Sequence, residues 1–83
     1  MEREAAFEKL TEILRDIFDN ETLDVFETTT AKDIDGWDSL MHLQIISEIE
    51  DQFGIKFTMG EIQGFLNVGD LLNNILLHLS SKS

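Results

Sequence analysis

Residues 39–54 read SLMHLQIISEIEDQFG and contain the clearest helical pattern of the chain. Asp38 or Ser39 can cap the free backbone N–H groups at its start. Gly54 suits its end, because glycine enters the left-handed conformation at little cost. The pattern therefore predicts a helix from Ser39 to Gln52 or Phe53. Its apolar residues recur at intervals of three and four and form one helix face, with Ile45 beside it: Leu43, Ile46, Ile49 and Phe53.

The same periodicity predicts helices on both sides of this stretch. A short helix is expected at about residues 59–63, and another begins after Asn67, which is a good cap, with Asp70 favourable to the helix dipole. The apolar face of this last helix consists of Val68, Leu71, Leu72, Ile75, Leu76 and Leu79. Upstream, a helix over about residues 2–19 has an apolar face of Phe7, Leu10, Leu14 and Ile17, widened by Ile13 and Phe18.

Residues 20–38 form a long connection without helical periodicity. Its scattered apolar residues can hold the loop against a core: Leu23, Val25, Phe26 and Ile34. An ordered loop of this length is uncommon in a compact domain unless it has a function. Because no segment reads as a strand, we predict an all-α fold. It is a small four-helix bundle with three long helices, one short helix and a long first loop, formed by residues 1–83 as a single domain.

The charge balance restricts the partners. There are 17 acidic residues against 6 basic ones, so the net charge is -11. This surface repels phosphate backbones, which argues against nucleic-acid binding, and favours proteins with basic patches. The alternative is that the acids only keep a small domain in solution. No segment reaches the ~20 apolar residues of a membrane span, and the N-terminus lacks a signal peptide, so we expect a cytoplasmic monomer.

A polar segment precedes the central helix, where residues 35–40 read DGWDSL. A glycine and a loop acid bring Ser39 to a helix N-terminus. Unpaired N–H groups and the helix dipole favour a phosphate ester at such a position. From this placement alone, an ordinary helix cap remains the stronger interpretation of Ser39.

Residues 36–40, GWDSL, resemble the G-x-D-S-L signature of acyl carrier proteins and of related carrier domains in polyketide and peptide synthases. The resemblance continues through residues 53–57, FGIKF, and 67–71, NVGDL, and covers almost the whole chain. It implies that Ser39 carries 4′-phosphopantetheine, installed from coenzyme A by a phosphopantetheinyl transferase. The thiol of this arm would hold acyl or aminoacyl groups as thioesters. The resemblance also places Gly36, Asp38 and Leu40 in the attachment site and makes the protein a carrier and not an enzyme.

The resemblance further implies a partner face on the outer side of the central helix: Leu40, Met41, Gln44, Ser47, Glu48 and Asp51. The implied partners are the transferase, the ligases or transferases that load acyl or aminoacyl groups, and synthase enzymes with basic docking patches. Met41 and Gln44 stand where fatty-acid-type carriers often have acids, and Trp37 precedes the Asp-Ser-Leu site. We therefore expect a specialised pathway, with fatty acyl, polyketide, aminoacyl and glyceryl cargo all open. Trp37 either stiffens the loop or contacts the arm or a partner.

We also expect an interior that can shelter an apolar chain, formed by residues of the last three helices and the turn after the short one: Leu43, Ile46, Ile62, Phe65, Leu72 and Ile75. A serine hydrolase is disfavoured, because no G-x-S-x-G motif surrounds Ser39 and the two histidines, His42 and His78, are expected to face solvent. No metal site is expected, since the chain has no cysteine and an EF-hand register would place Ala31 and His42 at the acidic positions. The remaining alternative is an unmodified, acidic helical domain that binds other proteins.

Overall fold

The helices of the computed structural model, which describes residues 2–81, follow the predicted periodicity. They are α1 (Arg3–Ile17), α2 (Ser39–Phe53), α3 (Met59–Gly64) and α4 (Val68–Ser81). A single 3-10 turn, η1 (Ala31–Asp33), interrupts the long connection, and residues 2–81 contain no strand. The predicted all-α bundle of three long helices and one short helix is confirmed.

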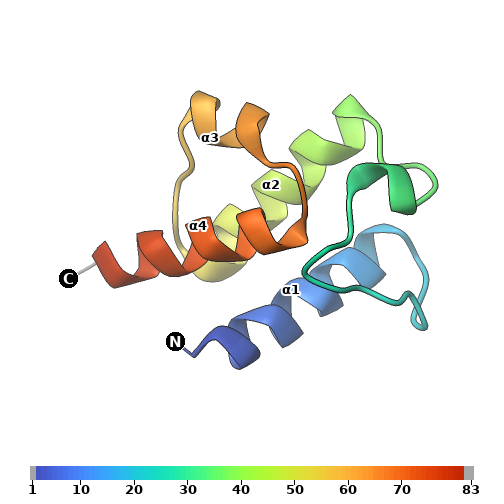
Figure 1. The fold of residues 1–83 in the computed structure, drawn as a ribbon, viewed down its shortest axis with the longest axis horizontal. Helices are drawn as coiled ribbons and strands as arrows, with labels where there is room; N and C mark the ends of the chain where they lie inside the picture. Colours follow the sequence, from blue (N-terminus) through green and yellow to red (C-terminus); the bar gives the residue numbers. More distant parts are fainter. Residues whose placement is uncertain (1, 82–83) are drawn as a thin grey trace.

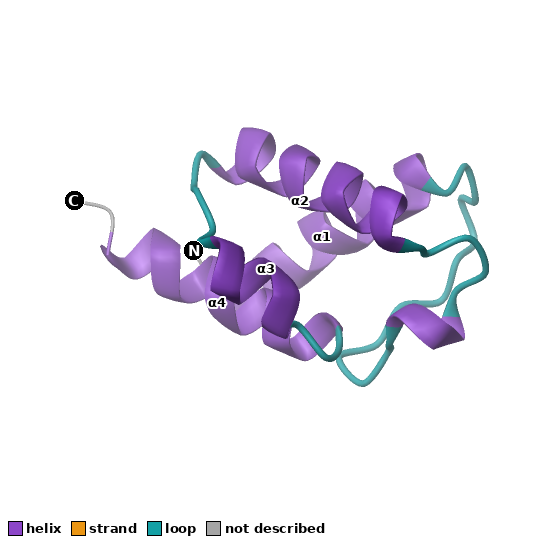
Figure 2. Cartoon of the chain, turned by 90° about the horizontal axis from the view of Figure 1, so that it is seen from above, coloured by secondary structure: helices purple, strands orange, loops and turns teal. Residues whose placement is uncertain are grey.

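Helix α1 packs against both α2 and α4, while α3 lies apart from α1 at one edge of the bundle (Figure 1). Seen from above, α3 lies over α4, and the long connection runs around the end of the molecule opposite the end of α4 (Figure 2). The fully buried side chains of the core come from α1, α2 and α4: Leu10, Ile13, Leu14, Ile45, Ile49, Val68, Leu71, Leu72 and Ile75. The core therefore joins three helices, and α3 covers its edge.

The long connection is fixed on the first turn of α4. The backbone N–H groups of Val68 and Gly69 donate to the carbonyl oxygens of Thr29 and Glu27, both at 2.8 Å. A Cβ atom at Gly69 would lie 3.0 Å from the Glu27 oxygen, so glycine permits this close approach. The buried Thr29 also accepts a hydrogen bond from the Phe26 N–H, at 2.9 Å. The bonds from Val68 and Gly69 use backbone N–H groups that the start of α4 would otherwise leave unpaired.

Two expectations about apolar residues are wrong. In the long connection Val25 and Ile34 are buried and Leu23 is half-buried, but Phe26 is 63% exposed. On α2, Leu43 is 53% exposed and does not belong to the inner face. At 3.6 residues per turn, the inner face of α2 continues toward Ser39 through His42 and not through Leu43. That inner face consists of Ile45, Ile46, Ile49 and Phe53.

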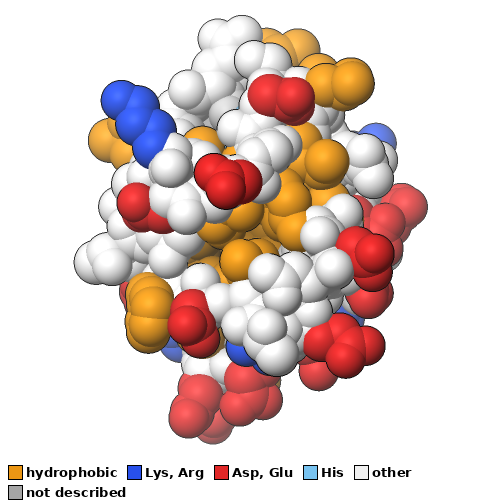
Figure 3. Space-filling model, turned by 90° about the vertical axis from the view of Figure 1, so that its right-hand side faces the viewer, with side chains coloured by type: hydrophobic (Ala, Val, Ile, Leu, Met, Phe, Trp, Pro, Cys, Tyr) orange, Lys and Arg blue, Asp and Glu red, His pale blue; other side chains and the backbone are white. Residues whose placement is uncertain are grey.

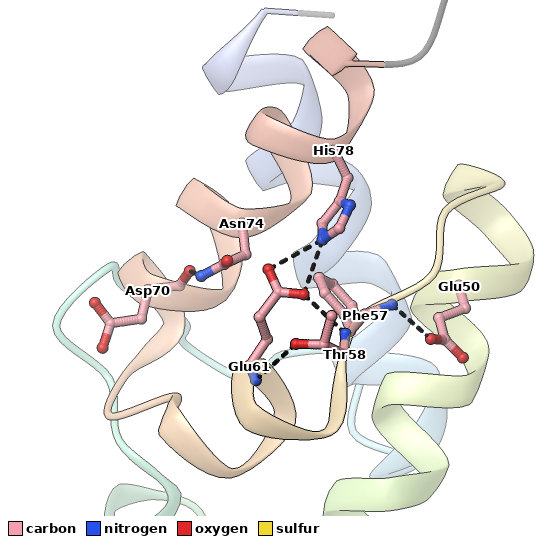
Figure 4. Close-up of polar contacts among 7 residues, drawn as sticks. All are labelled: Glu50, Phe57, Thr58, Glu61, Asp70, Asn74 and His78. Carbon is pink, nitrogen blue, oxygen red and sulfur yellow. Dashed lines mark hydrogen bonds and ion pairs between the residues drawn. The ribbon is translucent and has the colours of Figure 1, made fainter.

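Helix α3 has no fully buried residue. Its half-buried Ile62 packs against the core, and polar contacts at its start and to α4 also hold it (Figure 4). Thr58 and Glu61 form a capping box: the Thr58 N–H donates to Glu61 Oε1 at 2.8 Å, and the Glu61 N–H donates to Thr58 Oγ1 at 3.2 Å. His78 of α4 places Nε2 3.0 Å from both carboxylate oxygens of Glu61. His78 is thus half-buried and paired, and the expectation that it faces solvent is wrong.

Candidate functional site

Ser39 is exposed and is the first residue of α2. The preceding residue, Asp38, takes the cap: its Oδ1 accepts a hydrogen bond from the Met41 N–H at 2.8 Å. Within residues 2–81 the Ser39 hydroxyl has no hydrogen-bond partner. The ordinary helix cap is therefore Asp38, and Ser39 presents an unused hydroxyl at the positive end of the helix dipole.

The loop before Ser39 is shaped by Gly36 and Trp37. Gly36 has a φ of 89°, a conformation that side-chain-bearing residues rarely adopt. The Trp37 N–H donates to the Ile34 carbonyl at 3.3 Å, and the indole lies against the Phe18 ring with centroids 5.9 Å apart. Trp37 is half-buried. It therefore ties the loop to the end of α1, as expected for a stiffening role.

A groove with a volume of about 660 Å³ begins beside Ser39. One wall is α2, the opposite wall is α3, and the first turn of α4 and residues of the long connection complete it. Asp38 is the only charged residue among its lining residues. Of the interior expected to shelter an apolar chain, Leu43, Ile62 and Phe65 line this groove, whereas Ile46, Leu72 and Ile75 lie in the packed core. The open space is therefore shallower than expected.

Exposed apolar side chains lie in the lining of this groove and next to it in the sequence. Leu40 and Leu66 are each 78% exposed, and Met59 is 65% exposed. Figure 3 shows the face that carries the start of α2 and the long connection, where hydrophobic side chains gather in a hollow with acidic side chains around it. A large exposed apolar group is typical of a surface that binds something. Leu43, Met59 and Leu66 were not predicted for this surface.

The predicted partner face is exposed only in part. Leu40, Gln44, Ser47 and Asp51 are exposed on α2. Met41 and Glu48 are half-buried, and Met41 packs against the core. Glu48 Oε1 accepts a hydrogen bond from Gln52 Nε2 at 2.7 Å.

His42 is a site residue that the sequence reasoning missed. The indole Nε1 of Trp37 donates to His42 Nδ1 at 3.1 Å, and His42 Nε2 lies 3.0 Å from the Ile62 carbonyl oxygen. The ring also lines the groove and is half-buried, so the expectation that it faces solvent is wrong. Its position three residues after Ser39 puts it one helical turn away, which was the available signal.

None of the helices within residues 2–81 is both long enough and apolar enough to cross a membrane.

Comparison with known proteins agrees with this geometry. Residues 8–75 match the family described as "Phosphopantetheine attachment site". An acyl carrier protein of Streptococcus pyogenes serotype M3 is 46% identical over 68 residues, covering 82% of this chain and 88% of the relative. One from Streptococcus thermophilus is 41% identical over the same shares of both chains.

Solved structures show the same fold. The solution structure of the holo acyl carrier protein from Geobacter metallireducens superposes with a TM-score of 0.87 at 40% identity, over 93% of this chain and 88% of that one. The acyl carrier protein of Thermotoga maritima superposes with a TM-score of 0.86 at 26% identity, over 100% and 96%. Family, relatives and fold agree, and the chain belongs to the acyl carrier protein family, whose members are non-catalytic carriers with a phosphopantetheine prosthetic group.

Proposed function

We propose that Ser39 is the residue to which 4′-phosphopantetheine is attached. The observation that carries this proposal is that two neighbouring residues at the start of α2 have different roles. Asp38 caps the helix, and the Ser39 hydroxyl is exposed and without a partner in the described part of the chain. An unpaired, accessible hydroxyl is what a modifying enzyme needs. Gly36, two residues before the cap, supports the backbone turn that presents it.

The surroundings of Ser39 fit a phosphodiester. The start of a helix carries positive potential and backbone N–H groups that stabilise an attached phosphate. Leu40, the next residue, is exposed, and Ser39 itself lines the groove, so the arm has apolar surface to lie against. When bound, the arm supplies a thiol that holds cargo as a thioester. The chain itself contains no cysteine to compete with that thiol.

We propose that residues 1–83 act as one carrier domain whose cargo is an acyl group that rests, in part, in the groove. The nearly uncharged lining supports an apolar cargo better than an aminoacyl or glyceryl one, since a charged or strongly polar group pays a desolvation cost there. The weakly charged outer face at Met41 and Gln44 supports a specialised pathway rather than primary fatty acid synthesis.

The proposed partners are a phosphopantetheinyl transferase, an acyl-loading ligase or transferase, and synthase enzymes. A net charge of -11 favours docking patches that are basic, because opposite fields raise the rate of encounter. Leu40 and its exposed neighbours Gln44, Ser47 and Asp51 offer one apolar and three polar contacts along α2. Glu48 contributes to this face from a half-buried position.

Intact-mass measurement tests the attachment. After incubation with coenzyme A and a broad-specificity transferase, we expect the wild-type protein to gain one phosphopantetheine. Ser39→Ala should remain at the mass of the unmodified protein. Ser80→Ala is the matched control, because Ser80 is also an exposed helical serine but lies on α4, outside the proposed partner face, and it should be modified like the wild type. Modification of Ser39→Ala, or none of the wild type with several transferases, would reject the proposal and favour an unmodified interaction domain.

A further inference from the structure

Both ring nitrogens of His42 have a hydrogen-bond partner. An indole N–H can only donate, so His42 Nδ1 accepts the bond from Trp37 Nε1. A carbonyl oxygen can only accept, so His42 Nε2 donates to the Ile62 carbonyl. Both ring nitrogens are therefore used by one neutral tautomer, with its proton on Nε2. The three groups form a chain of two hydrogen bonds, which we call the Trp37–His42–Ile62 latch.

The latch spans the groove from one wall to the other. On α2, Ser39, His42 and Leu43 follow one another at intervals that put them on neighbouring positions of one face, and all three line the groove. On α3, Ile62 lines the opposite wall. The bond between His42 and Ile62 thus joins the two walls one helical turn from Ser39. Anything that lies between α2 and α3 at that depth must displace it.

Besides this bond, α3 rests on the core mainly through one half-buried side chain, that of Ile62. Helix α3 is six residues long and none of its residues is buried. Its other described side-chain tie runs to α4, through Glu61 and His78. The rings that support the latch are aromatic neighbours: Trp37 stacks on His42 at 6.0 Å between centroids, and Phe65 meets His42 edge-on at 6.3 Å. An element with so few buried contacts needs little free energy to move away from its neighbours. One hydrogen bond is therefore a large part of what holds α3 in place.

We propose that the Trp37–His42–Ile62 latch determines which cargo the carrier shelters. A short acyl group can remain outside the space that the latch spans. A longer apolar chain gains burial only if α3 moves away from α2, which breaks the bond between His42 and Ile62. The latch therefore opposes sheltering of long chains and leaves short cargo unaffected. His42 acts as a specificity-determining residue, and this inference rests on the proposed attachment at Ser39.

Cleavage of thioesters by hydroxylamine tests the latch in the holo protein. Octanoyl and acetyl groups are loaded on the arm, and mass confirms both loads. His42→Phe keeps a ring for the two aromatic contacts and removes both hydrogen bonds. We expect its octanoyl thioester to be cleaved about fivefold more slowly than that of the wild type, which is the effect of one net hydrogen bond. The acetyl thioester should be cleaved at the wild-type rate.

Two further variants separate a latch from a general loosening of α3. His78→Phe removes the tie to Glu61, but His78 does not line this groove. His42→Gln keeps an amide that can donate toward Ile62, and should restore part of the wild-type behaviour. The proposal is overturned if His78→Phe slows octanoyl cleavage as much as His42→Phe does. It is also overturned if no variant distinguishes octanoyl from acetyl.

A second readout does not need the arm. Trp37 is the only tryptophan and the chain has no tyrosine, so its fluorescence reports the latch in the unmodified protein. His42→Phe should change the Trp37 emission, and His78→Phe should leave it as in the wild type. If the arm fails to attach to Ser39, the proposed function is wrong. If the arm attaches but emission and cleavage are both insensitive to His42, only the latch is wrong.

Discussion

Helices α4 and α3 follow one another in the chain and are held in opposite ways. Helix α4 contributes four buried residues, Val68, Leu71, Leu72 and Ile75, to the core that α1 and α2 complete. Helix α3 buries none and is held by a capping box, by bonds to two histidines and by the half-buried Ile62. The stability of the fold therefore depends on buried side chains of α1, α2 and α4. The width of the groove depends on α3, which is held by few contacts and can open more easily.

Surface contacts also connect the helices α1, α2 and α4, which form the core. Arg3, at the start of α1, forms an ion pair with Glu27 of the long connection and donates from Nη1 to Asn73 Oδ1 of α4 at 2.7 Å. Lys9 of α1 lies 4.9 Å from the centre of the Phe53 ring and donates to the Gln52 carbonyl at 2.9 Å. These contacts tie α1 to both of its neighbours. None of these described contacts of Arg3 and Lys9 involves a residue of α3.

The largest effect on stability is expected when a leucine of the core is truncated and compared with a leucine of the groove. Leu72 is fully buried, and Leu72→Ala removes its packing and leaves a cavity, so we expect a loss of about 2–5 kcal/mol in the free energy of unfolding. Leu43→Ala is the matched control, because Leu43 lies half in solvent at the groove, and its loss should be within about 0.5 kcal/mol. Urea unfolding followed by circular dichroism measures both. Similar losses for the two variants would mean that Leu43 contributes to the core as much as Leu72 does.

Two glycines allow the same change to be made with opposite expected signs. Gly69→Ala places a Cβ 3.0 Å from the Glu27 oxygen and should destabilise the protein by about 1–3 kcal/mol, as overpacking does. Gly60 has nothing within 4 Å of an added Cβ, so Gly60→Ala should stabilise α3 by about 0.5–1 kcal/mol. Urea unfolding reads the first change, and amide exchange within α3 reads the second. A loss of α3 protection in Gly60→Ala would show that this helix depends on a glycine.

The same division explains what the sequence could predict. Local signals were sufficient for the helices: periodicity, the Asp38 cap and the left-handed Gly54, with a φ of 67°, all agree with the structure. They were insufficient around α3, because the bonds there join residues far apart in the chain. His42 meets Ile62 across 20 residues, and Glu61 meets His78 across 17.

Leu43 shows a second limit of sequence reasoning. An apolar residue at helical spacing was assigned to the core, although the inner face of α2 turns toward His42 at that level. The core ends before the groove begins, and a hydrophobic pattern cannot mark where that happens. Leu43 therefore appears as a core candidate in the sequence, whereas in the structure it lies with Met59 and Leu66 in an exposed apolar rim of the groove.

The smallest expected effect concerns pH and is confined to α3. The hydrogen bond from the Thr58 backbone N–H lowers the pKa of the Glu61 carboxyl, burial partly opposes this, and His78 lowers it further. Because the folded-state pKa lies below the unfolded value of about 4.3, the stabilisation is complete above that pH. It is lost as the pH falls through the folded-state pKa. Protonated Glu61 can no longer accept bonds from both Thr58 and His78 as a carboxylate.

Protection factors for amide exchange, which correct for the intrinsic effect of pH, measure this loss within α3 and α4 separately. Toward pH 4 and below, we expect the protection of α3 to fall before that of α4. Glu61→Gln should abolish this early fall, because it has no carboxylate to protonate. Glu48→Gln is the control, since Glu48 accepts its bond from Gln52 within α2 and should leave the α3 profile unchanged. If α3 and α4 lose protection together in the wild type, the two elements open as one unit. The groove would then open only with the core, and no latch at its wall could select cargo.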